Sequence, residues 1–129
     1  MKKLMILFLL LGLFSCENED ENSDISLDGS WQLKKLIDSK GQSFENDWSR
    51  IKISREKMSI VAPCNTGNGI VTVDDRTISV DGVATTNATC PEISLENLIL
   101  SGLSGSYTIS SERLTISSEI AELIFIRIE

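Results

Sequence analysis

Apolar and polar residues alternate in short runs along most of the chain after residue 29, which predicts β-strands with one buried and one solvated face. Short polar segments such as residues 55–57 and 74–76 separate the runs and predict tight turns between antiparallel neighbours. We expect about eight strands. They are residues 30–37, 50–54, 58–62, 69–73, 77–80, 107–109, 114–116 and 122–128.

One segment departs from this alternation. Between residues 93 and 103 the apolar positions recur at intervals of three and four, the period of an α-helix, and Gly102 or Gly105 would end it. Many short antiparallel strands with one late helix indicate an α+β fold. We expect a curled antiparallel sheet or a partly open β-barrel, with the helix closing one end or packing on one face.

The N-terminus has the features of an export signal. Lys2 and Lys3 precede an apolar stretch over residues 4–14, which is too short for a membrane-spanning helix of about 20 residues. Residues 13–16 (LFSC) resemble the lipobox of bacterial lipoproteins. We therefore predict a signal peptide at residues 1–15, lipidation of Cys16 with acyl chains such as palmitate, and a cell-envelope location on the outer membrane, at its periplasmic or surface face. An ordinary cleaved signal with a chance cysteine is the alternative.

An acidic segment follows. Residues 17–28 carry six carboxylates and no basic residue, so residues 16–28 are predicted to form the lipidated cysteine and an extended tether. The whole chain has 12 basic and 19 acidic residues, and removal of residues 1–15 takes away two of the basic ones, which leaves a net charge of −9. Such a surface disfavours nucleic acid as a partner. Residues 29–129 suffice for one folded domain.

Cys64 and Cys90 remain once Cys16 is assigned to the anchor. In an exported protein they are expected to form a disulfide; the alternatives are a reactive thiol or a metal site. The chain contains no histidine, which removes the usual Ser-His-Asp and Cys-His machinery, and two cysteines are too few for zinc. Asp74 and Asp75 are adjacent acids in a predicted turn, where solvation explains them. We predict no enzyme activity, no metal and no cofactor.

Several short motifs occur in the order typical of one family. Residues 27–33 (LDGSWQL) are similar to its opening L-x-G-T-W-x-L, residues 63–69 (PCNTGNG) to its G-C-N loop, and residues 86–90 (TNATC) to its T-x-x-A-C; Glu96 and the closing apolar strands then follow. On these motifs the chain resembles the META domain family, of which the bacterial heat-shock protein HslJ is a member. Pro63 and Thr89 depart from the family's glycine and alanine. The resemblance implies an α+β domain, no catalytic constellation, and a link to stress response and envelope integrity.

Four residues are candidates for contacts. Asn65 and Gly67 are expected to supply the positive φ of a tight turn, or else a binding loop. Phe44 and Trp48 lie in a polar stretch and either form an exposed contact or fold inward. Two functions stay open: an interaction or stress-related module that binds an envelope protein, and a lipocalin-like carrier of a small apolar ligand or lipid. Five aromatic residues outside the signal offer a thin lining for a carrier.

Overall fold

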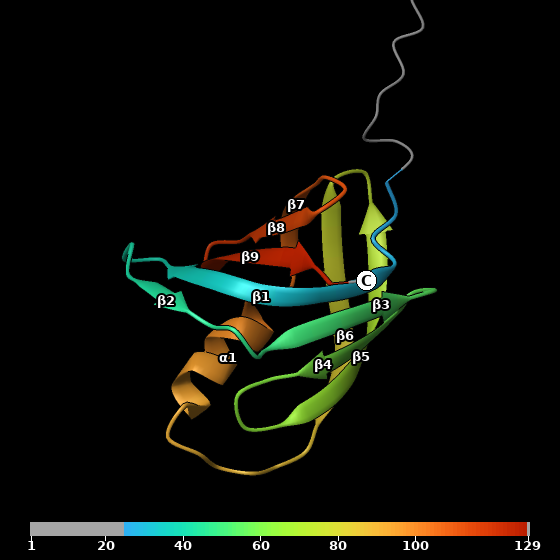
Figure 1. Ribbon diagram of the computed structural model, residues 1–129. Helices are drawn as coiled ribbons and strands as arrows, with labels where there is room; N and C mark the ends of the chain where they lie inside the picture. The colour runs from blue at the N-terminus through green and yellow to red at the C-terminus, as the bar shows by residue number, and fades with distance from the viewer. Residues whose placement is uncertain (1–24, 129) are drawn as a thin grey trace, which may run out of the picture.

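A computed structural model describes residues 25–128 of the chain, which form nine antiparallel strands and one helix (Figure 1). The strands join in the order β2-β1-β3-β4-β5-β6-β7-β8-β9, and β1 also pairs with β9. The elements are β1 (Gly29–Asp38), β2 (Ser43–Glu45), β3 (Arg50–Ser54), β4 (Lys57–Val61), β5 (Thr66–Asp74), β6 (Thr77–Thr85), α1 (Ile93–Ser101), β7 (Gly105–Ile109), β8 (Arg113–Ser117) and β9 (Ala121–Arg127).

The pairing of β1 with β9 closes eight strands into a barrel, with β2 as an additional strand. β1 is ten residues long, so its other edge can pair with both β3 and the short β2. The expected α+β class, strand number and late helix are confirmed, while the barrel is closed rather than partly open. The sequence pattern missed β2 because three residues are too few to show an alternation.

The interior of the barrel is packed with side chains. Alternate residues of β3, β4 and β8 point inward and are buried, as the period of two predicts. The largest fully buried side chains are Trp31, Phe125, Leu33, Leu36, Met58, Ile60, Ile78, Ile99, Leu103, Leu114, Ile116 and Leu123. A barrel of eight strands is just wide enough for side chains to fill it, which is what these residues do.

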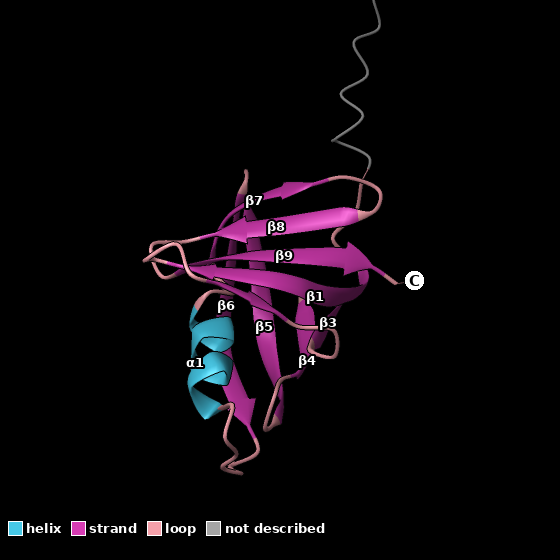
Figure 2. Cartoon of the chain, turned by 60° about the vertical axis from the view of Figure 1, so that its left-hand side comes forward, coloured by secondary structure: helices cyan, strands magenta, loops and turns pink. Residues whose placement is uncertain are grey.

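Helix α1 lies beside the barrel, away from the C-terminus, as Figures 1 and 2 both show. Ile99 and Leu103 insert into the core, and Leu95 and Leu98 pack against it. The helix ends before Gly102, whose N–H donates to the carbonyls of Leu98 and Ile99. The predicted helix and its glycine stop are therefore confirmed.

The two ends of the described chain lie side by side at the opposite end of the barrel (Figure 1). The N–H of Ile128 donates to the carbonyl of Ser30 there, at 2.9 Å. The β3–β4 turn and the β5–β6 turn lie at this same end, because each strand runs antiparallel to its neighbour. We call this end, with residues 25–28 and these two turns, the barrel mouth. Among residues 25–128, no helix is long and apolar enough to cross a membrane.

Candidate functional sites

The motif cysteines and Asn65 meet helix α1 in a buried polar cluster. Cys64 and Cys90 form a disulfide across 26 residues of sequence, as predicted. Glu96 is 2% exposed, and its Oε1 accepts hydrogen bonds from the backbone N–H groups of Cys64 and Asn65 at 2.9 and 2.8 Å. Its Oε2 accepts a 2.6 Å bond from Asn65 Nδ2. The carboxylate thus fastens the β4–β5 loop to the helix.

Asn65 is the centre of this Asn65–Glu96 cluster. Its Nδ2 also donates to the carbonyl of Ala88 at 3.0 Å, and its Oδ1 accepts from the N–H of Ala88 at 2.6 Å and from the Thr86 hydroxyl at 2.8 Å. Both ends of the amide are therefore occupied by the segment between β6 and α1. A side chain with its donors and acceptors satisfied internally is suited to hold three segments together rather than to bind a ligand.

The expectation of a positive φ at Asn65 and Gly67 is wrong. Neither residue adopts it, and Gly67 lies within strand β5. Gly67 is required instead for close packing: a Cβ there would lie 2.7 Å from Cγ2 of Thr85 and 2.8 Å from the carbonyl oxygen of Ala84. Gly67 thus lets β5 and β6 approach closely, because a glycine in a strand leaves room for a neighbouring backbone.

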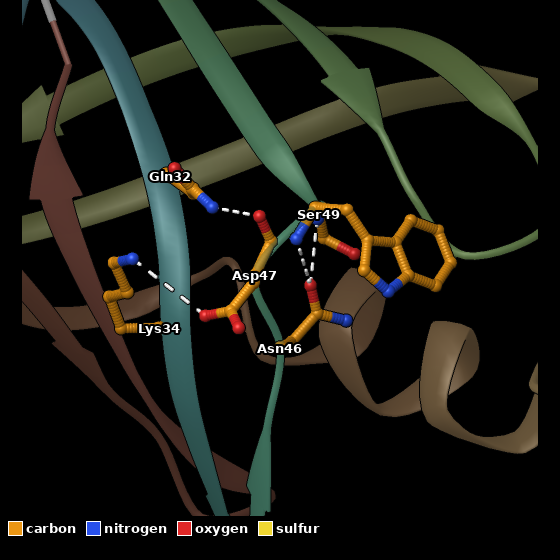
Figure 3. A network of polar contacts seen from close by, with 6 residues as sticks. Gln32, Lys34, Asn46, Asp47 and Ser49 are labelled. Atoms are coloured by element: carbon orange, nitrogen blue, oxygen red, sulfur yellow. Dashed lines mark hydrogen bonds and ion pairs between the residues drawn. The ribbon is translucent and has the colours of Figure 1, made fainter.

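A second site surrounds the segment between β2 and β3 (Figure 3). The Oδ1 of Asn46, a residue only 4% exposed, accepts hydrogen bonds from the N–H groups of Trp48 and Ser49 at 3.0 and 2.7 Å. Gln32 donates to the carbonyl of Asp47, whose carboxylate lies 3.7 Å from Lys34 Nζ. We call residues 46–49 the Trp48 loop. Hydrogen bonds with the side chains of Asn46 and Gln32 therefore fix the backbone of this loop.

The two aromatic candidates behave differently. Phe44 on β2 is half-buried and packs against the core, whereas the side chain of Trp48 is 50% exposed. Phe44 thus follows the inward alternative, and Trp48 follows the exposed one. An exposed tryptophan on a fixed backbone combines a large apolar area with little conformational freedom to lose on binding.

A third site is a partly open pocket of about 400 Å³ at the barrel mouth. Its lining residues are Ile25, Ser26, Leu27, Asp28, Ile53, Arg55, Glu56, Val71, Val73 and Tyr107. Residues 25–28 lie along one side of it, and we call them the N-terminal strap. Two of the lining residues, Ile53 and Val71, belong to the core and are 3% exposed.

Arg127 fastens the strap. Its Nη1 and Nη2 donate to the carbonyls of Asp28 and Ser26 at 3.0 and 2.9 Å, and its guanidinium lies 4.1 Å from the centre of the Trp31 ring. The Trp31 indole donates in turn to the carbonyl of Leu27 at 2.9 Å. The planar, five-donor guanidinium suits this combination of stacking and forked donation.

Cys16 and the predicted signal and tether up to residue 24 lie outside the described residues. Within residues 25–128, no group of three or more histidine, cysteine, aspartate or glutamate side chains is placed to hold a metal ion. Sequence reasoning missed Asn46 and Arg127 as positioning residues. An Asn two residues before an aromatic is a weak turn signal, and nothing local marks Arg127.

The barrel architecture agrees with solved structures. The chain is similar to a protein from Burkholderia xenovorans solved by NMR, with a TM-score of 0.64, 18% identity, and coverage of 78% of this chain and 81% of that one. A crystal structure of a lipocalin-like protein from Bacteroides uniformis gives a TM-score of 0.55 at 17% identity over 78% and 97% of the two chains. An uncharacterized protein from Bacteroides eggerthii gives 0.55 at 14% identity over 79% and 99%.

These likenesses show the fold, a small closed antiparallel barrel. Residues 23–129 match the META domain, and the chain belongs to the META domain family. The family resemblance inferred from the ordered motifs is thereby confirmed. No curated protein matches the chain significantly.

Proposed function

We propose that this protein is a non-catalytic interaction module of the cell envelope that binds a protein partner through the Trp48 loop. The observation that carries the proposal is a half-exposed tryptophan on a loop whose backbone is fixed by the buried side chain of Asn46. Tryptophan is enriched among residues that dominate binding energy, and a loop that is already ordered loses little entropy on association. Stress response is the setting that the family suggests for such a module.

The test compares two exposed apolar side chains. The tagged full-length protein is purified from its own envelope after mild crosslinking, as the native chain, as Trp48→Ala and as Ile70→Ala. Ile70 is 59% exposed on the outer face of β5, so it controls for the general loss of exposed apolar surface. We expect a discrete protein partner that Trp48→Ala loses by roughly tenfold or more, the effect of a hot-spot residue, and that Ile70→Ala retains. Equal recovery with all three proteins would overturn the proposal.

The anchor is a separate part of the proposal. It rests on the charged, apolar and cysteine-terminated order of residues 1–16. Two or three acyl chains on Cys16 would hold the protein stably at the membrane, since each buried methylene contributes about 0.8 kcal/mol. A Cys16→Ser variant should move from the membrane fraction to the soluble fraction, and intact mass should show the acyl chains on the native protein only. An unmodified Cys16 in the membrane-purified protein would contradict this anchor.

Carriage of a small apolar ligand is the second candidate. The packed interior leaves little room for a deep calyx, since the inward-facing core residues are at most a few per cent exposed. The specific observation in its favour is the mouth pocket of about 400 Å³, a volume within the range of small-molecule sites. A carrier of this kind would bind its ligand at the mouth and not in the middle of the barrel.

A further inference from the structure

We propose that the barrel mouth is a binding site for a small amphipathic molecule with an uncharged polar head group, such as a medium-chain monoacylglycerol, and that the N-terminal strap forms one wall of it. This inference rests on the second candidate function and gives it a place and a ligand class. Three observations carry it: the apolar floor of the pocket, the mixed charge of its rim, and the backbone of the turns that border it.

The floor is apolar and continuous with the core. Val73 contributes open aliphatic surface and Tyr107 adds a partly buried aromatic ring, while Ile53 and Val71 belong to the core at 3% exposure. Val73 is in phase with buried Val71 along β5, so it belongs to the inward-facing set, yet it is 46% exposed because the strand has reached the mouth. An inward-facing aliphatic side chain left half open is the surface that an alkyl tail would cover, with about 25 cal/mol gained for each Å² removed from water.

The rim carries charges of both signs. Arg55, Glu56 and Asp28 all line the pocket, and none of the three takes part in an ion pair with another described residue. An anionic head group would meet two carboxylates beside one guanidinium, and a cationic head group would meet the guanidinium as well as the two carboxylates, so part of the rim repels a charge of either sign. A neutral head bearing hydroxyl groups can donate to the carboxylates and accept from the guanidinium, so it suits this rim better than either charged alternative.

Backbone strain is concentrated at the same place. Among residues 25–128, the non-glycine residues with positive φ are Arg55 at 50°, Glu56 at 67° and Asp75 at 55°, and all three lie in the two turns of the barrel mouth. Asn and Gly are the usual occupants of such turns, and an unfavourable φ at other residues is retained mainly where the structure uses it. At the β3–β4 turn, positive φ at both Arg55 and Glu56 is what a two-residue hairpin turn between Ser54 and Lys57 requires, and this turn borders the pocket.

The strap completes the pocket without filling it. Leu27 packs partly against the core, and its carbonyl is held by the Trp31 indole, while Arg127 holds the carbonyls of Ser26 and Asp28. These bonds run to backbone carbonyls from side chains anchored on β1 and β9. The wall is therefore ordered before a ligand arrives, which lowers the entropy lost on binding.

The experiment uses two fluorescent probes with a common ring system, uncharged N-phenyl-1-naphthylamine and its sulfonated anion, anilinonaphthalene sulfonate. Each is titrated into the full-length chain, into Val73→Trp and into Ile70→Trp. Val73→Trp fills the mouth, while Ile70→Trp adds the same indole to the outer face of the same strand. We expect the neutral probe to bind, to be displaced by monocaprin, to lose roughly tenfold or more in affinity in Val73→Trp, and to bind Ile70→Trp within about twofold of the native chain.

Each of the other possible outcomes overturns one part of the proposal: the carriage of a ligand, the mouth as its site, or the neutral head group. No binding of either probe or of monocaprin to the native chain would remove both carriage and this site. Binding that Val73→Trp leaves unchanged would keep carriage but remove the mouth as its place. Tighter binding of the anionic probe, lost in Arg55→Gln, would replace the neutral head group by an anionic one. Chemical-shift changes at the Val71 and Val73 methyl groups of the native chain on probe addition give a check that needs no variant, and their absence on saturation would also overturn the mouth site.

Discussion

The Glu96 carboxylate accepts a 2.6 Å hydrogen bond from the side-chain amide of Asn65, a residue 31 positions earlier in the chain. Both groups are almost fully buried, at 2% and 6% exposure. A hydrogen bond to an ionised acceptor is stronger than one between neutral groups, and removal of such a buried acceptor leaves donors without a partner. This pair joins the only helix of residues 25–128 to the loop that carries one end of the disulfide.

Glu96→Gln should lower the free energy of unfolding by about 1–3 kcal/mol, the range for an unsatisfied buried polar group. The glutamine amide would present an NH₂ to one of the three donors that now meet a carboxylate oxygen. Urea unfolding followed by tryptophan fluorescence measures the change. Glu119→Gln, at an exposed position, is the control and should stay within about 0.5 kcal/mol of the native chain. An equal effect of the two substitutions would contradict the role of the cluster.

Replacement of both Cys64 and Cys90 by alanine should lower the stability by about 3–4 kcal/mol, the loop-entropy value for a bridge across 26 residues. Reduction of the native protein by dithiothreitol should lower it by a similar amount. The double variant serves as the control, because dithiothreitol should leave its unfolding midpoint unchanged. A native protein that is insensitive to reductant would show that the bridge contributes little.

Asn46→Ala should weaken partner capture as strongly as Trp48→Ala does, although it leaves the indole in place. Its Oδ1 fixes the N–H groups of Trp48 and Ser49, so without it the Trp48 loop must be ordered at the moment of binding. Asn46→Asp keeps the acceptor oxygen and should restore most of the capture. Partner recovery in the crosslinking experiment is the measurement. Full capture by Asn46→Ala would show that the loop does not need this fixed backbone.

Ser49→Ala should raise the stability by about 1 kcal/mol, since it removes a buried hydroxyl that lacks a partner. Ser49 is 2% exposed, and its Oγ makes no hydrogen bond within residues 25–128. Thermal and urea unfolding measure the gain, with Ser43→Ala at an exposed position of β2 as the control. A loss of stability in Ser49→Ala would indicate that a water molecule or another group satisfies the hydroxyl in solution.

Arg127→Lys should loosen the N-terminal strap while preserving the charge. Lysine cannot span the two carbonyls of Ser26 and Asp28 or stack in the same way on Trp31, and the lost cation–π contact alone is worth about 0.5–1 kcal/mol. Hydrogen exchange should show faster exchange of the backbone amides of residues 26–28 with little change in the barrel strands. Arg113→Lys, on an exposed position of β8, is the matched control. Unchanged exchange at the strap would show that Arg127 does not hold it.

The sequence alone was sufficient for the parts of this protein that depend on local pattern. Alternation along β3, β4 and β8 predicted the strands and their buried faces. Every second side chain of a strand points to the same face, whichever strands it pairs with. The three-and-four spacing and Gly102 located α1, because the helical period and a glycine stop are also local features of the sequence. Two cysteines in a chain with a predicted export signal and no histidine allowed the disulfide to be predicted, since few other roles remained.

Only the tertiary structure decided the relationships between distant residues. Barrel closure depends on the pairing of β1 with β9, and no local sequence pattern shows that these two strands pair. The true role of Gly67, as a point of close approach to β6, emerges only when the two strands are packed. The barrel mouth is made by residues 25–28, two turns and an arginine 99 positions away from the carbonyl of Asp28, so its floor, rim and strap exist only once the chain has closed on itself.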